Sequence, residues 1–78
     1  MVKAYILVET EGLEANKIAN ELLNIDEIET AHVIYGKYDI MCLVNAKNII
    51  ELKETVLQKI GKVKGVVNTS SMIIADEE

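Results

Sequence analysis

The sequence predicts a ferredoxin-like α+β fold, a four-stranded antiparallel sheet with two helices on one face, in the order β-α-β-β-α-β. Three observations lead to this prediction. Apolar, β-branched segments alternate with two segments whose apolar residues recur at helical spacing. The two halves echo each other, because residues 25–28 lead into the second strand as residues 63–66 lead into the fourth. A length of 78 residues allows one small domain, 1–78. A duplicated β-α-β unit with right-handed crossovers puts both helices on the same face.

The first strand is expected from Val2 to Glu9, and its nearly continuous apolar character predicts burial on both faces. A helix follows. Lys17 and Glu21 lie one turn apart on it and are expected to pair, and Glu14 near its start suits the helix dipole. Its apolar stripe consists of Ala15, Ile18, Ala19, Leu22 and Leu23.

The second strand is expected from about Ile28 to Tyr35, and a short hairpin turn at Gly36-Lys37 separates it from a third strand, Asp39 to Ala46. This third strand is apolar on both faces. Met41 and Leu43 lie on one face, and Ile40, Cys42 and Val44 lie on the other.

Asn48, followed three residues later by Glu51, is typical of an N-cap with a capping box. The second helix carries its apolar stripe at Ile49, Leu52, Val56 and Ile60. Gly61 is expected to end this helix, and the last strand should run from Val66 to Ile74 before an acidic end at residues 76–78.

Charge and composition exclude several classes of function. The net charge is −5 and there is no arginine, which argues against direct binding of DNA or RNA. The sequence contains neither a signal peptide nor an apolar stretch long enough to cross a membrane, so a cytoplasmic protein is expected. The single cysteine, Cys42, lies in an apolar run and is interpreted as a reduced core thiol.

The strands also predict self-association. Two helices cover one side of a sheet, and a free face of four six-residue strands measures roughly 400 Å². If that face is apolar, it is large for a monomer. Stacking two such sheets in a symmetric homodimer would bury it.

Two polar clusters are candidates for a binding site. In the first, Gly36 is explained by the turn, whereas Tyr38 and Asp39 are not required by it. The second is Asn68-Thr69-Ser70-Ser71, a polar run inside an apolar strand, which either forms cross-strand hydrogen bonds or lines a pocket. A carboxylate for an ammonium group, with hydroxyls and backbone amides for a carboxylate, would suit a free amino acid. Asp39 capping nearby backbone amides is an equally good explanation of that residue.

No metal or cofactor is expected. His32 and Cys42 are single residues on different strands, and zinc requires three or four ligands at set spacings. His32 has no nucleophile or orienting carboxylate in a recognisable motif, so it is interpreted as a polar residue at the sheet edge or interface, and the chain is not expected to be an enzyme.

Nearly the whole chain resembles the effector-binding (RAM) domain of the Lrp/AsnC, or feast/famine, transcription regulators. The resemblance lies in residues 2–8, in residues 33–40 around the hairpin, and in residues 65–74. The Gly-x-Tyr-Asp turn at Gly36 to Asp39 is its most specific part. In the last strand Thr69 fits the first threonine of the family pattern, and Ser71 replaces the second.

The resemblance implies a sheet-to-sheet dimer, further assembly into a ring of dimers, and a small amino-acid effector bound between dimers. By position, Gly36, Tyr38, Asp39, Thr69 and Ser71 would contribute to that pocket. Family regulators carry an N-terminal helix-turn-helix, which this sequence lacks. A stand-alone sensing module is therefore expected, acting through its own assembly or together with full-length Lrp/AsnC regulators.

Three alternatives remain. An ACT domain has the same element order, and residues 9–13 faintly resemble its ligand loop, which would move the site to Gly12. A small dimeric enzyme, such as an antibiotic-biosynthesis-type monooxygenase, would have to use His32 as its acid or base. The third alternative is an assembly module without a ligand. The sequence does not specify which amino acid binds.

Overall fold

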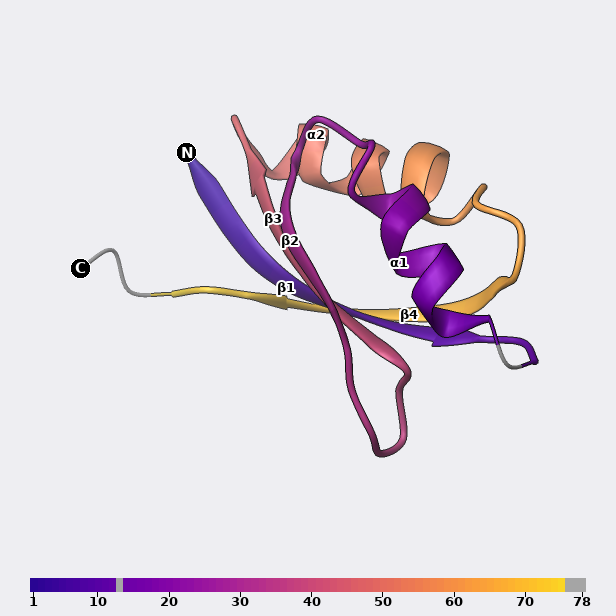
Figure 1. Ribbon diagram of the computed structural model, residues 1–78. Helices are drawn as coiled ribbons and strands as arrows, with labels where there is room; N and C mark the ends of the chain where they lie inside the picture. The colour runs from indigo at the N-terminus through magenta and orange to yellow at the C-terminus, as the bar shows by residue number, and fades with distance from the viewer. Residues whose placement is uncertain (13, 76–78) are drawn as a thin grey trace.

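One antiparallel sheet in the order β2-β3-β1-β4 carries two helices on one of its faces (Figure 1). The computed structural model describes residues 1–12 and 14–75, so Leu13 and the expected acidic end at 76–78 lie outside the described residues. The elements are β1 (Val2–Thr10), α1 (Ala15–Leu22), β2 (Ile28–Val33), β3 (Ile40–Ala46), α2 (Ile49–Glu54), the π-helix η1 (Thr55–Ile60) and β4 (Val66–Ile73). The ferredoxin-like order predicted from the sequence is confirmed.

The core lies between the sheet and the helices. Strand β1 is central and pairs antiparallel with β3 on one side and β4 on the other. Ile6 lies opposite Cys42, and both are fully buried on the helix side of the sheet. The thirteen buried apolar residues of this core are Ala4, Ile6, Val8, Ile18, Ala19, Leu22, Ile28, Ile40, Cys42, Val44, Ala46, Leu52 and Ile60. As predicted, Cys42 is a core thiol, and its burial raises the pKa of the thiol to about 11.

The opposite face of the sheet is covered by no element of the described chain (Figure 1). Tyr5 and Met72 lie opposite each other on it and are 40% and 53% exposed. The apolar residues of this open face are Tyr5, Leu7, Met41, Leu43 and Met72. Burial of β1 on both faces, as the sequence predicted, is therefore not achieved within a single chain.

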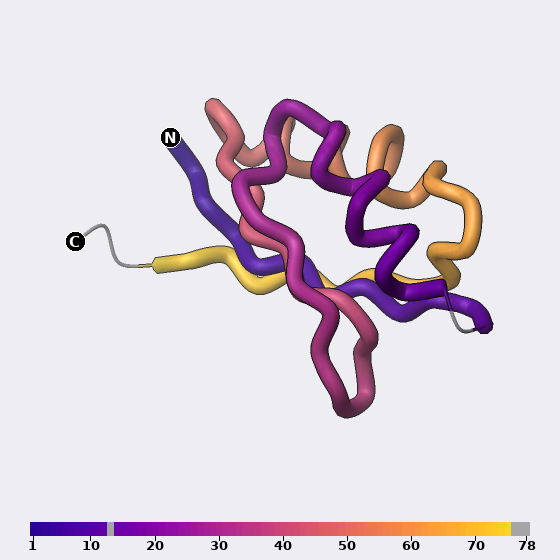
Figure 2. The backbone as a smooth tube through the Cα atoms, viewed as in Figure 1, coloured from indigo at the N-terminus to yellow at the C-terminus, as the bar shows by residue number. Residues whose placement is uncertain are grey.

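The hairpin between β2 and β3 is longer than predicted. Strand β2 ends at Val33 and β3 begins at Ile40, so Tyr35 and Asp39 belong to the loop and not to the strands. A hydrogen bond from the Ile34 amide to the Asp39 carbonyl, 2.8 Å long, closes the loop at its base. The loop extends away from the helices as an arm (Figure 2).

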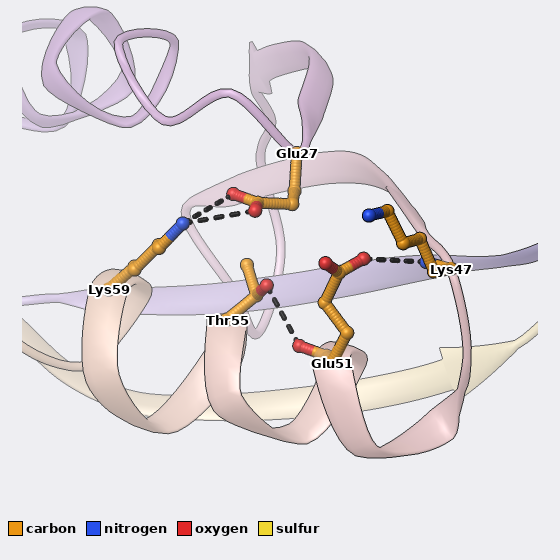
Figure 3. Close-up of polar contacts among 5 residues, drawn as sticks. All are labelled: Glu27, Lys47, Glu51, Thr55 and Lys59. Atoms are coloured by element: carbon orange, nitrogen blue, oxygen red, sulfur yellow. Dashed lines mark hydrogen bonds and ion pairs between the residues drawn. The ribbon is translucent and has the colours of Figure 1, made fainter.

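The second helix begins where the sequence predicts and then changes its geometry. The Asn48 side chain accepts a hydrogen bond from the Glu51 amide at 2.8 Å, which confirms the N-cap. The Glu51 carboxylate, however, binds the amide of Lys47 and not that of the cap residue, so the capping box is incomplete (Figure 3). From Thr55 onward the helix is a π-helix, in which the Thr55 hydroxyl donates to the Glu51 carbonyl at 2.9 Å.

The structure replaces the expected Lys17–Glu21 ion pair with another one, and it confirms the predicted end of the second helix. On α1 the Lys17 ammonium lies 3.9 Å from Glu14, the residue that precedes the helix, and not against Glu21. Both lysine and carboxylate are exposed, so this pair contributes little to stability. The second helical segment ends at Ile60, directly before Gly61, as predicted. No helix in the described part of the chain is long and apolar enough to span a membrane.

Candidate functional site

Two hydrogen bonds hold Asp39, at the base of the β2–β3 loop, against the end of the central strand β1. Its carboxylate oxygen Oδ2 accepts a hydrogen bond from the Thr10 amide at 2.8 Å, and its own amide donates to the Val8 carbonyl at 2.9 Å. The hairpin thus rejoins β1 at the point where β1 ends. Among the described residues only Oδ2 is engaged, so Oδ1 remains an acceptor for another donor. The capping explanation of Asp39 is therefore correct, and it does not exclude a binding role.

Gly36 and Tyr38 lie on the arm, away from the sheet. Gly36 is exposed and has a φ of 137°, a backbone conformation that residues with a side chain rarely adopt. This conformation explains why a glycine occupies the tip of the arm. The Lys37 ammonium lies 5.9 Å from the centre of the Tyr38 ring, within the range of a cation–π contact. The neighbouring Tyr35 side chain is 101% exposed. The arm therefore presents aromatic rings and a cation to solvent.

Thr69 and Ser71 lie on strand β4, opposite Val8 and Ile6 of β1. Because Val8 and Ile6 are buried on the helix side, the two hydroxyls also belong to the helix side of the sheet. Asn68 and Ser70 belong to the open face by the same alternation. Within the described chain, the one side-chain hydrogen bond in this run joins the Asn68 oxygen to the Thr69 amide, so cross-strand bonding of the hydroxyls is not observed.

A shallow cavity of about 310 Å³ lies beside Thr69, between the π-helix and β4. It is lined by Val56, Leu57, Gly61, Val66, Val67, Asn68 and Thr69. The register of β4 shifts between Glu9 and Thr10 of β1, which leaves Val67 unpaired next to this cavity. Both walls of the cavity therefore contain an irregular element, a π-helix and a β-bulge.

The five residues expected at the site do not line one cavity of a single chain. Asp39 and Thr69 both flank Val8, from opposite sides of β1. Two interstrand spacings place their Cα atoms about 10 Å apart. The arm with Gly36 and Tyr38, however, extends away from the helices, whereas the two hydroxyls of β4 are on the helix side (Figure 1). Thr10, which holds Asp39 in place, was not singled out from the sequence.

A second cavity, of about 390 Å³, adjoins the junction between β1 and α1. Its lining combines carboxylates and ammonium groups and consists of Glu11, Glu14, Lys17, Ile18, Glu21, Lys64 and Gly65. Gly12 forms the turn before α1 with a φ of 79°, as expected for a turn glycine. This is the region in which an ACT-like ligand site would lie.

The described residues contain no metal-binding cluster, and the single histidine lies outside the described cavities. No group of three histidine, cysteine, aspartate or glutamate side chains there is placed to hold a metal ion. His32 is exposed on the open face opposite Met41. It lines neither of the two cavities above, nor a third cavity of about 240 Å³ beside Glu27 and Lys59. The monooxygenase alternative needs His32 in a pocket, and the described pockets do not contain it.

Comparison with known proteins agrees with the fold. Residues 3–78 match the family described as Lrp/AsnC ligand binding domain. An uncharacterized HTH-type transcriptional regulator of Pyrococcus furiosus, PF1231, is 30% identical over 73 residues, which cover 94% of this chain and 49% of that protein. The chain thus spans about half the length of the curated relatives it matches.

Solved structures have the same fold over the whole chain. The hypothetical protein PHS023 from Pyrococcus horikoshii superposes with a TM-score of 0.89 at 32% identity, covering 99% of this chain and 93% of that one. A feast or famine regulatory protein from M. tuberculosis, Rv3291c, was solved in complex with L-methionine. It superposes with a TM-score of 0.83 at 22% identity, covering 99% of this chain and 52% of that one. With the family match extending over residues 3–78, the chain belongs to the Lrp/AsnC ligand binding domain family.

Proposed function

We propose that this chain is an amino-acid-sensing and assembly module that acts on transcription through its own oligomers or through partner regulators, without binding DNA itself. The family is one of ligand-binding domains, and related regulators include one solved with L-methionine. The observation that carries the proposal is the Asp39 carboxylate, which the Thr10 amide holds in place while its second oxygen stays available.

The proposed effector is a free amino acid that uses both of its charges. Asp39 Oδ1 would accept from the ammonium group, and backbone amides near Gly36 with the hydroxyls of Thr69 and Ser71 would donate to the carboxylate. The hydroxyls lie on the helix side of the sheet, whereas the arm with Tyr38 extends away from the helices. A site that combines all five residues therefore requires two copies of the chain, with the arm of one near β4 of the other.

The assembly would begin with a homodimer through the open face. The apolar side chains on that face form a continuous strip over three strands, Tyr5 and Leu7 on β1, Met41 and Leu43 on β3, and Met72 on β4. An apolar face of roughly 400 Å² is large for a monomer. A second copy would cover it with an identical strip, which a two-fold interface requires. Rings of dimers would follow through the arms.

The dimer is tested by sedimentation at micromolar concentration. The unmodified chain should sediment as a dimer or a larger assembly, because the open face is apolar. Leu7→Glu should yield folded monomers, because a carboxylate at the centre of the interface would be buried without a partner. The matched control is Ile50→Glu, on an exposed position of α2, which should leave the assembly unchanged. A folded monomer of the unmodified chain would contradict the dimer.

The effector is tested by a thermal-shift screen of the common amino acids, because a ligand of the folded state must raise its stability. Calorimetric titration of the best ligand would then compare Asp39→Asn with the original. Loss of one charge-assisted hydrogen bond costs about 1.5–3 kcal/mol, so we expect affinity to fall roughly ten- to hundredfold. Asp26→Asn, the same change at an exposed loop position, should have no effect.

The ACT-like alternative is tested with the same titration. A ligand in the cavity at the β1–α1 junction would depend on the Lys64 ammonium and not on Asp39. The ACT-like alternative would be favoured if Lys64→Gln lowers the affinity for the amino acid while Asp39→Asn leaves that affinity unchanged. If no common amino acid binds, the module without a ligand is favoured.

Direct DNA binding is tested by gel shift at physiological salt. The eight lysines are outweighed by thirteen acidic residues, and phosphate contacts supply most of the affinity for DNA. We expect no shift with duplex DNA in the absence of a partner regulator. A sequence-specific complex formed by this chain without any partner would contradict this part of the proposal.

A further inference from the structure

His32 occupies an edge position on the open face. The β2–β3 register places it opposite Met41, which in turn lies opposite Leu7, and Leu7 lies opposite Ser70. These four residues form one row across the sheet. The adjacent row, from Thr30 across to Met72, is the most apolar part of the face. His32 is therefore exposed in the single chain but lies beside the strip that a second copy would cover.

The charged groups on the face lie away from His32. Lys3 and Glu29 pair with each other at 3.7 Å, at the other end of the sheet. Glu9 lies two strands away from β2, on β1 opposite Asn68, and the carboxylate of Asp39 is bound to the Thr10 amide. No carboxylate of the described residues is within ion-pair distance of His32. Among residues 1–12 and 14–75, an imidazolium at position 32 therefore has no compensating anion.

Resting on the homodimer proposed above, we propose that His32 is a proton switch of self-association: its neutral form is compatible with the covered face, and its protonated form dissociates the dimer. A neutral imidazole beside Met41 costs little to bury. A cation there loses its hydration, and no carboxylate among the described residues of its own chain is close enough to compensate it. The two-fold symmetry places two copies of His32 in the same interface, so both oppose dimerisation when they are charged.

The sign of the pH dependence follows from proton linkage. If the dimer binds protons on His32 more weakly than the monomer does, dissociation takes up as many as two protons, and the dissociation constant rises as the pH falls. Histidine is the side chain that ordinarily changes charge between pH 5 and 8. His32 is the only histidine in the sequence, and the Cys42 thiol titrates far above this range. The α-amino group ordinarily titrates near the upper end of this range, so a pH dependence belongs to His32 only if His32→Gln removes it.

Sedimentation equilibrium from pH 5.5 to 8.0 tests the switch. We expect the dissociation constant to rise roughly ten- to hundredfold between pH 7.5 and 5.5. His32→Gln, a neutral side chain at both pH values, should remove most of this dependence and dimerise at pH 5.5. His32→Lys, a cation at both pH values, should dimerise weakly throughout. Circular dichroism at each pH would verify that the chain stays folded.

The outcomes separate this inference from the proposal on which it rests. A folded monomer at pH 7.5 would contradict the dimer itself. A dimer with the same dissociation constant at pH 7.5 and 5.5, or one that tightens in acid, would overturn the role of His32 and leave the dimer standing. A pH dependence that persists in His32→Gln would also overturn it, because the proton would then act elsewhere.

Discussion

The Asp39 carboxylate accepts a hydrogen bond from the Thr10 amide, 2.8 Å long, across 29 residues of sequence. This bond joins the base of the β2–β3 arm to the last residue of the central strand. Asp39 of the Gly-x-Tyr-Asp turn thus has a structural role, because its carboxylate fixes the base of the arm against the end of β1. The same bond engages Oδ2 alone and leaves Oδ1 able to accept a second hydrogen bond.

Asp39→Ala should destabilise the fold, because it leaves the part-buried Thr10 amide without its acceptor. A lost hydrogen bond of this kind costs about 1–3 kcal/mol. Asp39→Asn retains an acceptor oxygen and should cost less than Asp39→Ala. Urea unfolding of the two variants would measure the difference. Equal stability of Asp39→Ala and the original would show that the bond contributes nothing.

Gly65→Ala should be more destabilising than Gly12→Ala, although both glycines have a positive φ. A Cβ at Gly65 would lie 2.6 Å from Cδ1 of Ile18, so a core side chain on α1 would have to move, whereas a Cβ at Gly12 would meet nothing within 4 Å. We expect a loss of about 1 kcal/mol at Gly12 from the backbone and about 2–4 kcal/mol at Gly65 from backbone and packing together. Thermal melts of both variants would test this order.

The sheet and its two covering helices could be predicted because their signals are periodic. The alternation in β3 and the helical spacing of Ile18 and Leu22 agree with the observed burial. The π-helix could not be predicted from the apolar stripe, since Leu52 and Ile60 fit an α-helix equally well. The one local signal is Thr55, whose hydroxyl bonds back to the Glu51 carbonyl, a contact that often distorts helices.

The candidate site was predicted less completely, for two physical reasons. The face on which Thr69 lies depends on the β4 register, which a bulge at Val67 shifts by one residue. The partner of Asp39 is a backbone amide, and any residue at position 10 except proline supplies one, so sequence carries no signal for it. The arrangement of the arm relative to β4 of another copy is a property of the assembly and stays a prediction.

Glu27→Gln should reduce the sensitivity of the fold to acid. The Lys59 ammonium binds both carboxylate oxygens of Glu27, at 2.9 and 3.0 Å, and connects η1 to the loop before β2 (Figure 3). This contact lowers the pKa of Glu27 below its usual 4.5. The stabilisation is therefore present above pH 4.5 and is lost as the pH falls through the lowered value.

Melting temperatures at pH 7 and pH 3 would measure this effect. The original should lose more stability between the two pH values than Glu27→Gln does. Glu54→Gln, at an exposed position of α2, is the matched control and should behave like the original. An identical acid response of Glu27→Gln and the original would show that the pair is too solvated to matter.

Cys42 makes the fold sensitive to alkali. Its thiol is fully buried, and burial raises its pKa from 9.0 to about 11, because the thiolate is poorly solvated in the core. In the unfolded chain the thiol ionises near 9, so the unfolded state gains free energy above that pH. The stabilisation by the neutral thiol is present below pH 9 and is lost as the pH rises through about 11. Between pH 8 and 10.5 the loss should be about 2 kcal/mol.

Cys42→Val isolates this contribution, because valine has a similar volume and no proton to lose. Urea unfolding under reducing conditions at pH 8 and 10.5 would compare the two proteins. Every other ionisable group is the same in both proteins, so the difference between the two pH responses belongs to Cys42. We expect the original to lose about 2 kcal/mol more than Cys42→Val. Parallel losses would mean that the thiolate is tolerated in the core, through water entry or local opening of β3.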